Sequence, residues 1–303
     1  MQQETLNAKS PSSAVPSKVR DYAQLLKPNL SMMVVFSSVI GYLMAPEVSF
    51  ELMPVLVLYL GGLLVTGGAN TLNQILEHEG DKLMRRTMLR PIPDGRMSRT
   101  EAWIIAAIAG FGGASLLGFY FNLLTGILSF ISLLLYAFAY TPMKRVHPIA
   151  VLIGAIPGAL PPLLGWVAAT GQVWGPAAMG GWLLFLFQFF WQFPHYWAIG
   201  WVGYDEYLKA GISMLPSQER SSRFTGLQCM FYSIVLIPLA LFPRLMHMCS
   251  NWGMWIAMAG GVLYFAASVN FYRKNDFKSA KQVMYASFVY LPLVLLALYF
   301  TKL

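Results

Sequence analysis

Charged residues are scarce in this chain. Only 11% of its 303 residues are Asp, Glu, Lys or Arg, whereas a soluble domain carries about 25%. Acidic residues are the scarcer kind, with 13 Asp and Glu against 21 Lys and Arg, and 57% of the chain is hydrophobic. This composition excludes an ordinary soluble domain and indicates a protein embedded in a lipid bilayer. The net charge of +8 does not indicate nucleic-acid binding, because the basic residues lie in short connections between apolar segments, where they set the topology.

Cysteines and targeting signals are also sparse. The two cysteines, Cys229 and Cys249, have no metal-ligand spacing, so we expect free thiols or small core residues and no disulfide. Residues 1–20 are polar and lack the apolar core of a signal peptide. We therefore expect residues 1–24 to be a disordered cytoplasmic tail and residues 25–303 to form one transmembrane domain.

Long apolar runs, in contrast, recur along the whole chain. About 20 apolar residues cross the hydrocarbon core as a helix, and by that measure the sequence predicts nine spanning segments in an all-α, polytopic membrane bundle. A cytoplasmic N-terminus places 19 of the 21 Lys and Arg residues on the cytoplasmic side, in agreement with the positive-inside bias. The predicted segments are 29–46, 53–76, 101–120, 122–140, 149–169, 177–199, 223–243, 252–272 and 282–301.

The first long polar connection follows the second apolar run. Asn73, Glu77 and Asp81 are spaced four apart, so a helix that continues through them stacks the three side chains on one face. Three oxygen donors in a column suit a hard cation such as Mg²⁺. A solvated loop with the usual positive bias is the alternative. The basic residues that follow suit the oxygens of a phosphate ester, and they are Lys82, Arg85, Arg86 and Arg90.

A second polar segment closes the sixth apolar run and continues into the next connection on the same side. Gln192 and His195 lie at the end of that run, where polar side chains usually face a cavity or pair internally. A lone histidine at a helix end is more often a satisfied interface residue than a ligand. Asp205 and Glu206 follow as an acidic pair, which predicts a second wall of a metal or diphosphate site opening to the cytoplasmic face, with a solvated loop as the alternative.

Several motifs together carry a family resemblance. Asn73-x3-Glu77-x3-Asp81 resembles the first Asp-rich motif of the intramembrane UbiA-type prenyltransferases. The continuation Met84-Arg85-Arg86-Thr87-x2-Arg90-Pro91 resembles the branch of that superfamily that farnesylates protohaem IX, the haem O synthases. Further stretches that agree, within a resemblance running from about residue 25 to 300, are Lys27-Pro28, Tyr140–Arg145, Gly158–Trp166, Trp191–His195 and Tyr207–Pro216.

The resemblance implies an activity and roles for these residues. The activity is Mg²⁺-dependent transfer of the farnesyl group of farnesyl diphosphate to a vinyl group of haem B, with addition of water, giving haem O for haem-copper oxidases. The implied catalytic residues are Asn73, Glu77, Asp81 and Lys144; the metal ligands are Asn73, Glu77 and Asp81 with Asp205 or Glu206. The implied substrate-binding residues are Lys82, Arg85, Arg86, Arg90, Arg145, Gln192, His195 and Tyr207, with His195 expected at the haem iron or a propionate.

The chain departs from the family pattern at two acidic positions. Glu77 stands where the family often has Asp, and Glu206, preceded by Asp205, stands where the family usually has Asp before the tyrosine of the second motif. Either acid can hold Mg²⁺, so the sequence leaves the choice between Asp205 and Glu206 open.

The short N-terminal tail lacks the Arg-rich, acid-poor pattern of a mitochondrial presequence, so we expect a bacterial inner membrane. The resemblance implies haem A synthase or oxidase assembly proteins as partners, and no nucleic-acid partner is expected. A prenyltransferase for a quinone precursor or another aromatic acceptor is the alternative. A transporter is less favoured, because its ionisable residues would lie along the spans at the midplane, whereas here they collect at one face.

Overall fold

The computed structural model describes residues 17–216 and 219–303, and within these ranges it contains helices, turns and one isolated β-bridge, with no β-strand. The all-α prediction is therefore confirmed for the described part of the chain. The elements are α1 (Lys18–Leu26), α2 (Pro28–Met44), α3 (Leu52–Asp81), α4 (Arg99–Tyr120), α5 (Leu123–Leu134), the π-helical turn η1 (Leu135–Tyr140), α6 (Thr141–Met143), α7 (Ala150–Thr170), the 3₁₀ turn η2 (Pro176–Ala178), α8 (Met179–Val202), α9 (Tyr204–Lys209), α10 (Phe224–Leu239), α11 (Phe242–Leu245), α12 (Asn251–Lys274) and α13 (Phe277–Phe300).

By length and apolar composition, the described helices support seven or eight membrane spans. Seven segments qualify: α3, α4, α5 to α6, α7, α10 to α11, α12 and α13. The α1–α2 pair, bent by 41°, makes an eighth if it crosses as one span. Helix α8 occupies the sixth predicted segment, but Gln188, Gln192 and His195 lower its hydropathy. The predicted count of nine is therefore not confirmed, although each predicted segment is mostly helical.

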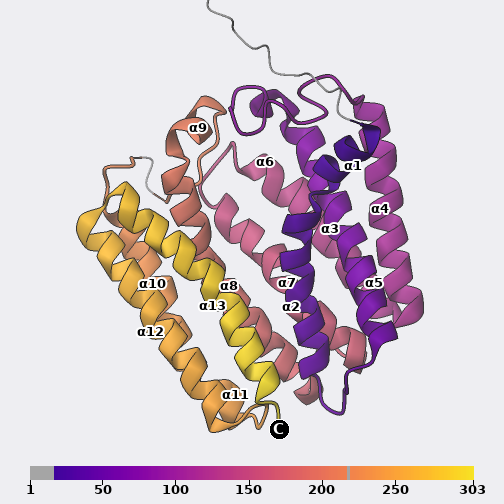
Figure 1. Ribbon diagram of the computed structural model, residues 1–303, viewed down its shortest axis with the longest axis vertical. Helices are drawn as coiled ribbons and strands as arrows, with labels where there is room; N and C mark the ends of the chain where they lie inside the picture. Colours follow the sequence, from indigo (N-terminus) through magenta and orange to yellow (C-terminus); the bar gives the residue numbers. More distant parts are fainter. Residues whose placement is uncertain (1–16, 217–218) are drawn as a thin grey trace, which may run out of the picture.

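The helices form one bundle in which α7 and α8 lie between two groups (Figure 1). On one side α3 packs on α4, and α2 packs on α7; on the other, α13 packs on both α12 and α8. Helices α1, α6 and α9 and the loop after α3 lie at one end of the bundle, whereas α11 and the C-terminus lie at the other (Figure 1). The long polar connections predicted to share a face are therefore gathered at one end.

Two glycines allow α2 and α7 to approach backbone to backbone. A Cβ atom at Gly41 would overlap the carbonyl of Pro162, and one at Gly165 would overlap the carbonyl of Ser38. Close approach through small residues is a common way for membrane helices to pack, because it maximises van der Waals contact.

Part of the predicted N-terminal tail is folded. Residues 18–24 belong to α1, whose N-cap Ser17 accepts a hydrogen bond from the Arg20 amide. Asp21 and Leu25 are the buried residues of this helix. The expected disorder of residues 1–24 is therefore corrected for this stretch, and residues 1–16 lie outside the described part of the chain.

Candidate active site

The last turns of α3 carry the polar column that the spacing predicts. Asn73, Glu77 and Asp81 are 4%, 6% and 0% exposed, so all three lie on the helix face that is turned into the bundle. The Asn73 Nδ2 donates to Glu77 Oε2 at 2.9 Å. Glu79 lies on the outer face of the same helix, with 64% of its side chain exposed. The inner face of the helix thus carries two buried carboxylates and an amide, whereas the acid that lies between the carboxylates in sequence is on the outer, solvated face.

Each buried carboxylate is neutralised by one basic side chain. Lys144 Nζ lies 2.6 Å from Glu77 Oε1, and Arg90 Nη1 lies 2.6 Å from Asp81 Oδ2. Lys144 follows α6 and Arg90 belongs to the loop 82–98, so segments far apart in sequence converge on the end of α3. Asp81 Oδ1 is buried without a hydrogen-bond partner among the described residues, which leaves this oxygen available to a further ligand.

Two residues that the sequence did not single out as functional join this cluster. Thr141 Oγ1 accepts a hydrogen bond from Asn73 at 3.1 Å and donates to the Tyr136 carbonyl at 2.9 Å, within the π-helical turn η1. Lys27, between α1 and α2, is near enough to interact electrostatically with both carboxylates and both of their cationic partners. A basic residue directly before Pro28 at the start of a span was a visible signal for Lys27, whereas the role of Thr141 depends on a contact across the fold.

The other predicted basic residues are placed differently from one another. Lys82 pairs with Glu79 at 2.9 Å on the outer side of α3. Arg86 Nη2 donates to the hydroxyl of Tyr207 at 3.4 Å, which links the loop after α3 to α9. The guanidinium of Arg145 lies against the α3 backbone near its end. Arg86 and Tyr207 therefore connect the loop to α9, and Arg145 lies at the end of α3, while Lys82 lies on the outer side of that helix.

The structure separates the two acids of the second motif. Glu206 Oε2 accepts a hydrogen bond from the Arg85 amide at 2.7 Å, and Glu206 Oε1 accepts one from Lys209 at 3.0 Å. The bond from Lys209 and then that from Arg85 lower the pKa of the Glu206 carboxyl. Asp205 pairs with Arg220 at 3.3 Å, and its side chain is 77% exposed. Glu206 therefore faces the loop that carries the basic residues, and Asp205 does not.

The donor set at the end of α3 fits a magnesium ion that shares its ligands with a substrate. No group of three His, Cys, Asp or Glu side chains is close enough to enclose a metal ion within residues 17–216 and 219–303. Magnesium, however, usually binds through one or two carboxylates together with water and substrate phosphates. The buried pair Glu77 and Asp81, the Asn73 amide and the unpartnered Asp81 oxygen are such a set.

A cavity of about 260 Å³ opens one helical turn deeper in the bundle. Its wall is mostly apolar and comes from α2, α3, α4, α5, η1, α7, α8 and α13. Asn70, one turn before Asn73 on α3, belongs to this wall, as do Tyr136 and Gln192. The predicted substrate residue Gln192 is 1% exposed and donates to the Ala155 carbonyl at 2.8 Å, which fixes its amide against α7. The cavity thus combines an apolar interior with a few oriented polar groups near the carboxylate column.

His195 lines the same cavity in a fixed orientation. Its ring stacks on Trp191 with centroids 4.8 Å apart, and its Nδ1 lies 2.7 Å from Ser287 Oγ. The Ser287 hydroxyl donates its single proton to the Met284 carbonyl at 2.5 Å, so it accepts from the histidine. If the Ser287 proton goes to Met284, the histidine proton lies on Nδ1 and Nε2 carries the lone pair.

Comparisons with known proteins agree with this architecture. The UbiA prenyltransferase family matches residues 34–292. The protoheme IX farnesyltransferase of Cytophaga hutchinsonii is 42% identical to this chain, over 94% of this chain and 99% of that protein.

Solved structures share the fold at low sequence identity. A digeranylgeranylglyceryl phosphate synthase superposes with a TM-score of 0.77 at 20% identity, covering 94% of this chain and 99% of its own. A UbiA homologue from Archaeoglobus fulgidus, bound to GPP and Mg²⁺, superposes with a TM-score of 0.62 at 15% identity, covering 92% and 99%. The helical bundle, the extent of the family match and the identity to curated relatives together show that the chain belongs to the UbiA prenyltransferase family.

Proposed function

We propose that this protein transfers the farnesyl group of farnesyl diphosphate to a vinyl group of haem B, with addition of water, to give haem O and diphosphate. The observation that carries the proposal is the buried column of Asn73, Glu77 and Asp81, which begins one helical turn after Asn70, a residue of the wall of an apolar cavity. The 42% identity to a protoheme IX farnesyltransferase over nearly the whole chain supports haem as the acceptor.

The diphosphate end of the donor would bind at the column. Asn73, Glu77 and Asp81, joined by Glu206 from α9, would hold Mg²⁺, which when bound supplies positive charge to the leaving diphosphate. Lys144 is already held at the buried acids, together with Arg90. When the substrate binds, these two cations would leave the carboxylate oxygens and pair with phosphate oxygens. There they would neutralise the charge that develops when the allylic C–O bond breaks.

The apolar cavity would receive the farnesyl chain and protect its cation. The bonding electron pair leaves with the diphosphate, and the π electron pair of the vinyl group then forms a bond from its terminal carbon to the allylic cation. Water adds to the cation formed on the adjacent carbon and releases a proton, which accounts for the hydroxyl group. Most of the surface of the cavity is apolar, which would restrict premature capture of the farnesyl cation by water.

His195 would bind the acceptor. His195 lines the cavity and Ser287 contacts its Nδ1, so Nε2 would be the nitrogen that ligates the haem iron. Titrating the purified protein with haem should shift the haem absorbance in wild type and not in His195→Ala. The assignment would be contradicted if His195→Ala lost diphosphate binding but gave the same haem spectrum as the wild type.

In the proposed topology, the protein crosses a bacterial inner membrane nine times. The N-terminus and the end of the bundle that carries α1, α6 and α9 would face the cytoplasm. Support comes from the concentration of 19 of the 21 Lys and Arg residues on that side and from bacterial relatives.

The proposal is tested by expressing the protein in a host that lacks haem O and analysing extracted haems by mass spectrometry. Wild type should yield a haem that has gained one farnesyl group and one water, and Asp81→Asn should yield none. Glu79→Gln, on the exposed face of the same helix, is the matched control and should retain activity. Inserted wild-type protein that leaves haem B unmodified would refute the proposal.

A further inference from the structure

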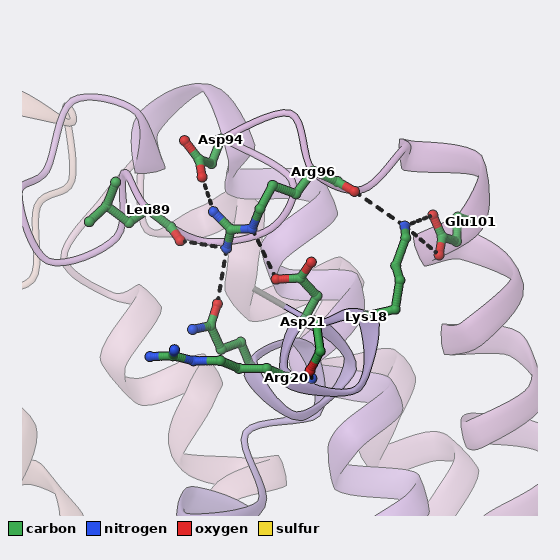
Figure 2. Close-up of polar contacts among 9 residues, drawn as sticks. Lys18, Arg20, Asp21, Leu89, Asp94, Arg96 and Glu101 are labelled. Atoms are coloured by element: carbon green, nitrogen blue, oxygen red, sulfur yellow. Dashed lines mark hydrogen bonds and ion pairs between the residues drawn. The ribbon is translucent and has the colours of Figure 1, made fainter. Parts of the chain in front are cut away.

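Arg96 joins α1 to the loop after α3 (Figure 2). Its Nε donates to Asp21 Oδ1 at 3.0 Å, and one terminal nitrogen donates to Gln24 Oε1 at 3.2 Å. The same nitrogen donates to the Leu89 carbonyl at 3.0 Å, and the other terminal nitrogen pairs with Asp94. One guanidinium therefore bonds to both α1 and the loop 82–98.

The Arg96 contact lies one residue from the buried ion pair of the site. Leu89, whose carbonyl Arg96 holds, directly precedes Arg90, the partner of Asp81. Further hydrogen bonds make this part of the loop compact: the Arg90 amide donates to the Thr87 carbonyl, and Thr87 Oγ1 donates to the Asp81 carbonyl at 2.9 Å. A shift of the loop at Leu89 would therefore move the Arg90 side chain relative to the carboxylate column.

Helix α1 is itself fixed to the bundle at its other end. Gln74, on α3, donates to the Leu25 carbonyl at 2.7 Å, and Ser31 Oγ donates to the Leu26 carbonyl at 3.2 Å. Asp21, the acid that meets Arg96, is only 2% exposed. A rigid helix with a buried acid thus provides a fixed anchor for the Arg96 fork.

We propose that Arg96 is a positioning residue, which acts through α1 to hold Arg90 in place for the diphosphate of the prenyl donor. The inference rests on the proposed function, because it assigns Arg90 to that diphosphate. An arginine suits the task, since its planar fork makes several charge-assisted hydrogen bonds in fixed directions. Lysine at this position would keep the charge and lose the fork.

The test compares Arg96→Gln, Arg96→Lys and Asp21→Asn in the purified full chain. Inorganic diphosphate with Mg²⁺ is the binding probe, and the KM values for farnesyl diphosphate and haem B are measured separately. Tyr22→Phe is the matched control, because Tyr22 lies beside Asp21 on α1 and its hydroxyl bonds to Glu101 on α4 and not to the Arg96 guanidinium.

In Arg96→Gln we expect the Kd for diphosphate and the KM for farnesyl diphosphate to rise by roughly ten- to hundredfold, with the KM for haem unchanged. Asp21→Asn should change the same two constants in the same direction, Arg96→Lys should be intermediate, and Tyr22→Phe should match wild type. A residue that only stabilises the fold would lower the folded fraction and leave these constants unchanged. The proposal is overturned if the correctly folded variants keep wild-type diphosphate binding, or if both KM values rise together.

These outcomes separate the two proposals. Wild type that binds diphosphate in the expected, Arg96-dependent way but forms no farnesylated haem would refute the proposed acceptor and leave the role of Arg96 intact. Wild type that forms farnesylated haem, with Arg96→Gln indistinguishable from it, would refute only the role of Arg96.

Discussion

Replacing Lys144 by methionine should destabilise the ligand-free protein strongly, because it leaves Glu77 buried without its cation. The two side chains are only 10% and 8% exposed, and their charged atoms are 2.6 Å apart. Adding Glu77→Gln to Lys144→Met removes the unpaired charge and keeps an oxygen that can accept the Asn73 hydrogen bond. Stability should therefore return in the double variant.

The magnitude follows from the geometry of the pair. At 2.6 Å and an effective dielectric constant of about 20, the attraction between unit charges is about 6 kcal/mol. Desolvation of both groups offsets part of this, and removing one partner of a buried pair typically costs about 3–5 kcal/mol. We expect Lys144→Met to lie in that range and the double variant to lie within about 1 kcal/mol of wild type.

The assay is the free energy of unfolding in detergent micelles with EDTA present, so that no Mg²⁺ compensates the free carboxylate. Diphosphate binding in Mg²⁺ is measured in parallel. It should be impaired in both the single and the double variant, since neither has the Lys144 ammonium. A Lys144→Met protein as stable as wild type, or a double variant less stable than the single one, would refute the reasoning.

Three further predictions concern other parts of the structure. Ser287→Ala frees the His195 ring, so affinity for haem should fall by roughly tenfold while diphosphate binding is unchanged, as followed by haem absorbance; equal losses would contradict this. Lys302→Met removes hydrogen bonds to three carbonyl groups, one in the last turn of α2 and two just after it. The free energy of unfolding, measured by denaturant titration, should therefore fall by about 1–3 kcal/mol. An unchanged free energy of unfolding would count against a stabilising role for these bonds. Because the pKa of Glu206 is lowered in the folded protein, its hydrogen bond from the Arg85 amide should be charge-assisted at neutral pH and should weaken as pH falls through that lowered pKa. Amide exchange at Arg85, corrected for its intrinsic rate, checks this, and protection that does not change with pH in the wild type would disprove it.

The fold class and the main polar column could be predicted because both depend on local patterns. Apolar runs of sufficient length mark membrane helices, and the spacing of four between Asn73, Glu77 and Asp81 places them on one helix face. The number of spans was less predictable, since α8 is long but carries polar residues that face the cavity and the bundle.

The rest depends on contacts between residues that are distant in sequence. The sequence of α1 alone predicts a polar tail, because the residues that anchor this helix are distant in sequence: Gln74 on α3 and Arg96 in the following loop. The adjacent acids Asp205 and Glu206 are placed differently because Glu206 accepts a hydrogen bond from the Arg85 amide, 121 residues away in sequence. No local pattern contains these pairings.

The central claim is tested most directly in a purified system with two competing acceptors. The protein is given farnesyl diphosphate, Mg²⁺, haem B and an equal amount of an aromatic quinone precursor, and the products are identified by mass spectrometry. The account predicts that only haem is modified, gaining one farnesyl group and one water, and that EDTA abolishes the reaction. A prenylated aromatic compound beside unmodified haem, or farnesylation that persists in EDTA, would contradict it.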